Sequence, residues 1–145
     1  MNKIIKLLIF ITIIMAISIG GVACAKTPLP AATPDDAETS AIKAYADPAT
    51  QTTLEGLSEN NLDKYTQYAD SQFKAAITQD MLTQTSAQLN SQLGSFVSIT
   101  FLRTEKQAEY TIVHYKATYS NGETGVRMVF DTDHLVAGQW SEQVE

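Results

Sequence analysis

The chain has a single cysteine among its 145 residues, and several kinds of signature are missing altogether. One cysteine excludes an internal disulfide and also a zinc site built from several thiolates. The sequence has no G-x-S-x-G turn for a nucleophilic serine and no glycine-rich phosphate loop. We therefore expect a fold stabilised by its apolar core alone, with no metal, no cofactor and no recognisable catalytic set.

Basic residues are also scarce. The chain has 10 lysine and arginine residues against 16 aspartate and glutamate residues, which gives a formal charge of −6. Such a chain repels phosphate groups, which excludes nucleic acid as a partner, and it is not attracted to anionic lipid. Any association with a membrane must therefore come from an anchor.

Residues 1–23 have the pattern of a secretory signal peptide. Lys3 and Lys6 provide the positive start, and the apolar core LLIFITIIMAISI follows. Removing this segment takes away two lysines and no acidic residue, which lowers the formal charge from −6 to −8. The mature chain is therefore distinctly acidic.

Cys24 directly follows this apolar run, in the sequence GVAC, and three fates are open to it. GVAC resembles the box of bacterial and archaeal lipoproteins, in which the cysteine is acylated and becomes the new N-terminus. Ordinary secretion is the second fate, because Ala23 and Ala25 fit the small-x-small rule and cleavage after Ala25 would discard the cysteine. An uncleaved anchor is the third, since Leu7–Ala25 is just long enough to span a bilayer core of about 30 Å.

Two observations favour lipid attachment. Cys24 lies at the end of the apolar run, and no partner thiol or metal site elsewhere would use it. Residues 25–40 contain three prolines among small and acidic residues, which is typical of an extended tether. We expect residues 24–46 to be the attachment cysteine and its tether, with the protein lipid-anchored on the extracytoplasmic face of the cell membrane. The alternative is a protein secreted after cleavage following Ala25.

Residues 47–142 form the expected domain, and its first half has helical signals. Asp47 and Pro48 are typical of a helix start, with an N-cap followed by proline at the first helical position. Apolar residues recur at helical spacing up to Gly94, which is suited to end the last helix. Further helix starts are expected at Asn61, at Asp70 or Ser71, and at Thr78.

After Gly94 the apolar period changes to two, which predicts strands. The predicted strands are SFVSITFLRT, AEYTIVHYKATY, ETGVRMVFD and LVAGQW. Asn121-Gly122 between the second and third is a strong hairpin signal, because both residues tolerate positive φ. Helices followed by a meander predict an α+β fold, with the helices packed on one face of a curved antiparallel sheet.

A family resemblance is carried by LDKYTQYADSQFKAAITQDML, LGSFVSI, YTIVHYKATYSNGE and VRMVFDTDHLVAGQW. These segments are similar to a bacterial and archaeal family of unknown function in the nuclear-transport-factor-2-like (cystatin-like) superfamily. Its members occur alone on lipoproteins or fused ahead of α/β-hydrolases. The resemblance covers residues 47–140, and its most specific part is Phe130-Asp131 with Gly138-x-Trp140. It implies a fold and an envelope location, and it brings no established catalytic residues.

His114 is the main candidate for chemistry in the predicted sheet. It shares a strand face with Tyr110 and Ile112, and in folds of this class one sheet face lines a cone-shaped pocket. A pocket histidine could act as a general base aided by Asp63 or Asp70. The alternative is a half-buried histidine that is hydrogen-bonded to a backbone carbonyl or to solvent. The candidate pocket residues are Tyr110, His114, Tyr119 and Trp140.

Three further features have structural interpretations. Trp140 is expected to pack over Gly138 and close the helix–sheet core, with an exposed anchor for a partner as the alternative. His134 lies in a predicted turn with Asp131 and Asp133, which lack the further spaced ligands of a calcium loop. We expect the aspartates to bond nearby amides of that turn. The six tyrosines suit both core positions and the rim of an apolar groove.

Three functions are compatible with these features. The first is a non-catalytic module, tethered by lipid, that binds a small ligand, a peptide or an envelope protein through its concave sheet face. The second is a small hydrolase or isomerase that uses His114 with a carboxylate, by analogy with other enzymes of the superfamily. The third is a subunit that forms a homodimer through its sheet. The sequence favours the first, because it has a tether and lacks a catalytic set.

Overall fold

The computed structural model describes residues 36–143. The helices are α1 (Asp36–Ser58), α2 (Leu62–Tyr65), α3 (Ser71–Ala76) and α4 (Gln79–Leu93). The strands are β1 (Phe96–Gln107), β2 (Tyr110–Tyr119), β3 (Gly122–Phe130) and β4 (Val136–Glu142). Each strand pairs antiparallel with the next, in the spatial order β1-β2-β3-β4. The predicted α+β class, with helices followed by an antiparallel meander, is confirmed.

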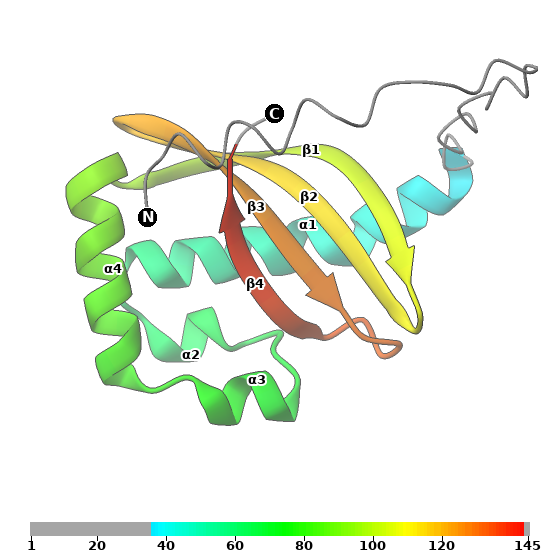
Figure 1. The fold of residues 1–145 in the computed structure, drawn as a ribbon, viewed down its shortest axis with the longest axis horizontal. Coiled ribbons are helices and arrows are strands. Elements are labelled where there is room, and N and C mark those ends of the chain that lie inside the picture. The colour runs from blue at the N-terminus through cyan, green and yellow to red at the C-terminus, as the bar shows by residue number, and fades with distance from the viewer. Residues whose placement is uncertain (1–35, 144–145) are drawn as a thin grey trace, which may run out of the picture. The chain divides into compact units, whose positions relative to one another are not determined.

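α1 lies against one face of the twisted sheet (Figure 1). In this view α1 passes behind the strands, α4 stands beside one end of the sheet, and α2 and α3 lie below it. The main core forms between α1 and the sheet, because every second side chain of a strand points to the same face. Its largest fully buried side chains include Tyr115, Phe130, Leu54 and Met128. A smaller cluster on the helical side consists of Leu57, Tyr65 and Leu82.

The predicted helix start at Asp47 is wrong, because α1 begins at Asp36 and continues through Pro48. Asp47 lies inside the helix and does not act as an N-cap. Its Oδ1 accepts a hydrogen bond of 2.8 Å from the hydroxyl of buried Tyr115, and its Oδ2 is 2.9 Å from the Lys43 ammonium. Asp47 therefore joins the helix to the sheet rather than starting the helix.

Packing explains why the helix is continuous across the proline. Ile42, Ala46 and Ala49 recur at helical spacing, and all of them are buried in the main core. Pro48 lies on the exposed side, where water can bond the carbonyl that a proline leaves without a donor. Residues 36–46, which the sequence assigned to the tether, therefore belong to α1 and to the folded domain.

The other predicted helix caps are confirmed. Asn61, Asp70 and Thr78 each accept a hydrogen bond from the backbone N–H three residues on, at 3.1, 2.6 and 3.3 Å respectively. Asp70, rather than Ser71, is the cap of α3. Gly94 follows α4 with a φ of 78°, a conformation that favours glycine.

The β2–β3 hairpin forms where the sequence predicted it, but its turn does not have the predicted positive φ angles. Ser120 and Asn121 connect the strands, and neither Asn121 nor Gly122 has a positive φ. The backbone N–H groups of Ser120 and Asn121 donate to the carbonyls of Ser95 and Leu93, both at 2.9 Å. Docking onto the loop between α4 and β1 therefore holds this turn.

Candidate functional site

The face of the sheet that points away from α1 carries a dense set of ionisable side chains, and we call it the helix-free face. The residues on either side of His114 are buried in the core with α1, so His114 points to the opposite side. Directly paired residues share a face, and the register places Arg103, His114, Arg127 and Trp140 in one row across the four strands. No described helix crosses this face in Figure 1. By the same register, the helix-free face comprises Arg103, Glu105, Tyr110, Ile112, His114, Lys116, Gly125, Arg127, Val129, Gly138, Trp140 and Glu142.

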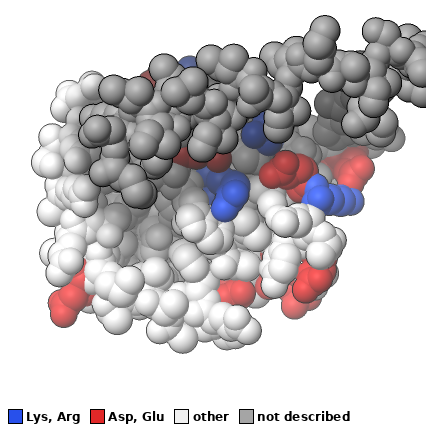
Figure 2. Space-filling view, viewed as in Figure 1, with Lys and Arg blue, Asp and Glu red and all other residues white. Residues whose placement is uncertain are grey.

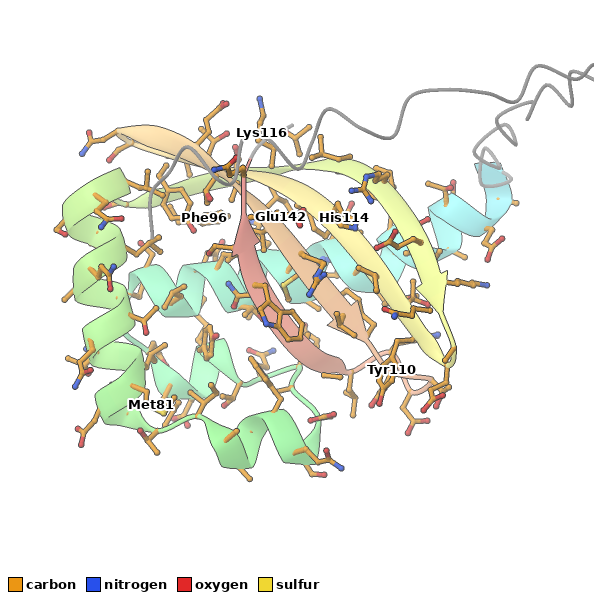
Figure 3. The ribbon with its side chains drawn as sticks, viewed as in Figure 1. Met81, Phe96, Tyr110, His114, Lys116 and Glu142 are labelled. Carbon is orange, nitrogen blue, oxygen red and sulfur yellow. The ribbon has the colours of Figure 1, made fainter. Side chains whose placement is uncertain are left out.

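His114 lies in the middle of the helix-free face, with 4% of its surface exposed. Its Nδ1 is 2.6 Å from Oε1 of Glu142, and its Nε2 is 3.2 Å from Oε1 of Glu105. Figure 3 labels His114 and Glu142 on their strands. A neutral imidazole has one N–H and can donate to one carboxylate, so donating to both requires both ring protons. In this geometry each ring nitrogen already has a carboxylate partner, which leaves neither of them free to take a proton from a substrate.

Gly125 makes the contact between His114 and Glu142 possible. β3 lies between β2 and β4, and Gly125 of β3 is the register partner of Glu142. A Cβ at Gly125 would come within 2.8 Å of Cγ of Glu142. Because glycine has no Cβ, the Glu142 side chain can lie across β3 and reach the imidazole on β2. The His114 network therefore depends on this glycine.

Other charges on the helix-free face form local pairs. Arg103 lies 3.7 Å from Glu105, and the Lys116 ammonium lies 3.2 Å from Glu123. Acidic and basic atoms accordingly lie next to one another over the strands (Figure 2). Exposed pairs of this kind contribute about 0–1 kcal/mol each, so their main effect is on the electrostatic pattern of the face.

The structure brings three of the four predicted pocket residues onto the helix-free face. His114 and Trp140 lie in one row, and Tyr110 lies near the β1–β2 turn on the same side of β2 as His114. Tyr119 is on the opposite side, 4% exposed, with its ring edge-on to Phe96 at a centroid distance of 5.7 Å. Burial raises the pKa of Tyr119 to about 12.

Neither of the two aspartates that the sequence suggested as partners of His114 contacts it. Asp63 lies beside a polar hollow on the helical side, and Asp70 caps α3, where its Oδ1 accepts from the Phe73 N–H. The carboxylates that contact His114 are those of Glu105 and Glu142, and no bond to a backbone carbonyl replaces them. Glu142 reaches His114 through the pairing of β3 with β4, and the sequence pattern does not specify the register of that pair.

Trp140 packs over Gly138, as the sequence predicted. A Cβ at Gly138 would lie 2.2 Å from the edge of the indole ring. The ring does not close the helix–sheet core, however, because it lies on the helix-free face with 49% of its surface exposed. The Arg127 guanidinium lies over the ring, with Cζ 4.9 Å from the ring centroid.

The turn chemistry expected around His134 is confirmed. Oδ1 of Asp131 accepts hydrogen bonds from the backbone N–H groups of Asp133 and Leu135, at 2.9 and 2.8 Å. His134 has a φ of 63° and stacks on Tyr45 with a centroid distance of 4.0 Å. Within residues 36–143, no group of three or more His, Cys, Asp and Glu side chains is placed to hold a metal ion.

The described hollows lie on the helical side. A polar hollow of about 410 Å³ is lined by Glu59, Asn60, Asn61, Leu62, Asp63 and Gln79. A small apolar notch of about 50 Å³ is lined by Leu57, Tyr65, Ile77, Met81, Leu82 and Thr85. His114 lines neither of them. Cys24 and the predicted signal sequence lie outside the described residues. Within residues 36–143, no helix is long and apolar enough to cross a membrane.

The sequence model of a family described as "Protein of unknown function (DUF3887)" matches residues 51–138. The chain belongs to the DUF3887 family. The DUF3887 match begins within α1 and ends in β4, so it includes His114, Gly125 and Arg127. A solved structure of a SEC-C motif containing protein from Rhodopseudomonas palustris is similar at 14% identity and a TM-score of 0.48. That similarity covers 70% of this chain and 81% of the other. None of the curated proteins compared with the chain matches it.

Proposed function

We propose that the chain is a membrane-tethered, extracytoplasmic module that binds a protein or small ligand of the cell envelope through its helix-free face. The observation that carries this proposal is Trp140, a large aromatic side chain left 49% exposed beside an ordered row of charges. Half-exposed tryptophan next to arginine is typical of residues that dominate binding surfaces. The proposal includes the nuclear-transport-factor-2-like ancestry that the sequence resemblance implies.

The contacts of His114 support binding over catalysis. A general base needs a nitrogen within reach of a substrate proton, and both ring nitrogens contact carboxylates instead. His114 is also 4% exposed and lines neither described hollow. In this proposal the histidine holds Glu105 and Glu142 in place, and the exposed residues around it contact the partner.

The tether is supported by sequence alone. Residues 1–23 resemble a signal, Cys24 follows directly, and the folded domain has no use for a thiol. Intact mass of the chain purified from membranes tests the anchor, with Cys24→Ser as the control. We expect a mass increment of lipid size that the variant lacks, whereas a mature chain beginning at residue 26 would refute lipid attachment.

Photo-crosslinking in native membranes tests the binding face. A photoreactive residue at Tyr110 is on the helix-free face and 38% exposed, and one at Met81 is on the helical side and 51% exposed. We expect Tyr110 to trap one specific partner and Met81 to trap only random neighbours. Specific capture at Met81 alone would contradict the proposal, and capture of a second copy at Tyr110 would identify the partner as this chain.

A further inference from the structure

Arg127 is a basic side chain of the helix-free face whose charge has no acidic partner among the described residues. Its neighbours Arg103 and Lys116 lie within ion-pair distance of Glu105 and Glu123. Glu142 lies on the adjacent strand, but its carboxylate is 2.6 Å from His114. The histidine thus engages the nearest acids of this face and leaves the guanidinium of Arg127 available.

The Nε atom of Arg127 is buried and has no hydrogen-bond partner within residues 36–143. Leaving a buried donor unsatisfied costs about 1–3 kcal/mol, and more for a charged group. Buried polar groups in folded proteins are nearly always bonded, so an exception calls for an explanation. An anion that pairs with the guanidinium would offset this cost through its charge.

Trp140 holds the guanidinium group of Arg127 in place on the helix-free face. The guanidinium lies over the indole ring, with Cζ 4.9 Å from the ring centroid. The N–H donors of a guanidinium match the two oxygens of a planar carboxylate. The exposed part of the indole supplies apolar surface for the carbon atoms that carry the carboxylate.

We propose that Arg127 and Trp140 form a site for a carboxylate-bearing ligand. This inference rests on the proposed binding role of the helix-free face and names the chemistry that the face recognises. Glu105 and Glu142 lie on the same face, so a monoanion is favoured over a phosphate dianion, which these carboxylates repel more strongly. The carboxylate belongs either to a small organic acid or to an acidic side chain of a peptide.

Titration of the purified full chain tests the site with three probes: acetate, an end-blocked Gly-Glu-Gly peptide that carries one carboxylate, and inorganic phosphate. Trp140 is the only tryptophan of the chain, so its fluorescence reports on this site alone. The Nε–H resonance of Arg127 in nitrogen-15 spectra provides a second readout. We expect saturable changes with a carboxylate probe. A saturable change with acetate would show that a small organic acid is enough for binding. A change with the peptide but not with acetate would identify a peptide as the ligand.

Three variants decide the assignment. Arg127→Gln removes the charge, and Arg127→Lys keeps the charge but removes the planar fork; each should weaken carboxylate binding about tenfold or more. Lys74→Gln changes the net charge as Arg127→Gln does, at an exposed position of α3 outside this row, and should leave binding unchanged. Circular dichroism confirms that each variant is folded.

Several results would contradict the proposed carboxylate site. No saturable response to either carboxylate, equal or tighter binding of phosphate, or binding that survives Arg127→Gln would each overturn the site. If a photoreactive residue at Tyr110 traps a partner while no carboxylate binds, the carboxylate site is refuted and the partner-binding role stands. If carboxylates bind while Tyr110 traps nothing, the partner-binding role fails and the site stands.

Discussion

Alternate side chains of β2 point to opposite faces of the sheet, and different interactions stabilise the two sets. Toward α1, Val113, Tyr115 and Ala117 are fully buried among apolar neighbours. Toward the helix-free face, His114 is almost as buried, at 4% exposure, but its contacts are two carboxylates. Burial alone therefore does not distinguish the faces. The side chains that face α1 are stabilised by apolar packing, and His114 on the other face is stabilised by pairing with charged groups.

The largest expected effect comes from removing a side chain that fills the core between α1 and the sheet. Phe130 is fully buried there, so Phe130→Ala should lower the free energy of unfolding by about 3–5 kcal/mol. Val129→Ala, one residue away on the helix-free face, is the matched control and should have a much smaller effect. Urea denaturation measures both. Equal losses for the two variants would remove the distinction between the faces.

High pH should also act on the side that packs against α1. Burial raises the pKa of Tyr119 from its ordinary value of 10.0 to about 12, so the folded state holds this proton more tightly than the unfolded state. The resulting stability is fully present below the unfolded pKa and is lost as the pH rises toward the folded pKa.

The Tyr119→Phe variant isolates that effect. Between pH of about 9 and about 12, the wild-type chain should lose about 2 kcal/mol more of its free energy of unfolding than the variant. Denaturation at several pH values, with tyrosinate absorbance as a second signal, gives the comparison. Identical pH profiles for the two chains would contradict the burial of this hydroxyl.

On the helix-free face, the largest loss of stability is expected from Gly125→Ala. The added Cβ would lie 2.8 Å from Cγ of Glu142 and should displace that carboxylate from His114. We expect a loss of about 1–2 kcal/mol and a shifted His114 ring resonance, because overpacking strains this contact.

Glu142→Gln is the matched variant for this glycine, since it keeps the side-chain size and removes the charge. If Gly125→Ala acts through Glu142, the double variant should lose less stability than the sum of the two single variants. Strict additivity would show that the glycine acts on something other than the His114 network.

The smallest expected effect comes from an exposed pair at the rim of the helix-free face. Lys116→Gln removes the partner of Glu123 and should change the free energy of unfolding by less than about 0.5 kcal/mol. Thermal denaturation at low and high salt tests this. A loss as large as that of Gly125→Ala would mean that the face depends on all its charges, rather than on those around His114.

The sequence predicted most of the fold because its signals are local. Asn61, Asp70 and Thr78 cap helices through their own backbone, and Gly94 adopts the positive φ expected of it. The failure at Asp47 has a physical cause as well. Burial along one side of α1 outweighs the local preference of a proline for a helix start.

The candidate site was predictable in part. The β2–β3 hairpin fixes its own register, and a two-residue loop of Ser120 and Asn121 places Arg127 opposite His114. The predicted strand SFVSITFLRT ends at Thr104, one residue before Glu105. The β1–β2 turn uses Ala108 at a φ of 54°, a residue that gives no turn signal. The partner Glu142 depends on a register shift between β3 and β4, which no pattern in the sequence specifies.

Hydroxyl-radical footprinting of the full chain tests the central claim, that the helix-free face is the binding surface, most directly. The oxidation rates of Trp140, Tyr110 and Met81 are compared between native membranes and the purified chain, since all three side chains are exposed and reactive. Binding through the helix-free face predicts slower oxidation of Trp140 and Tyr110 in membranes, with Met81 unchanged. Protection of Met81 while Trp140 and Tyr110 keep their rates would contradict it.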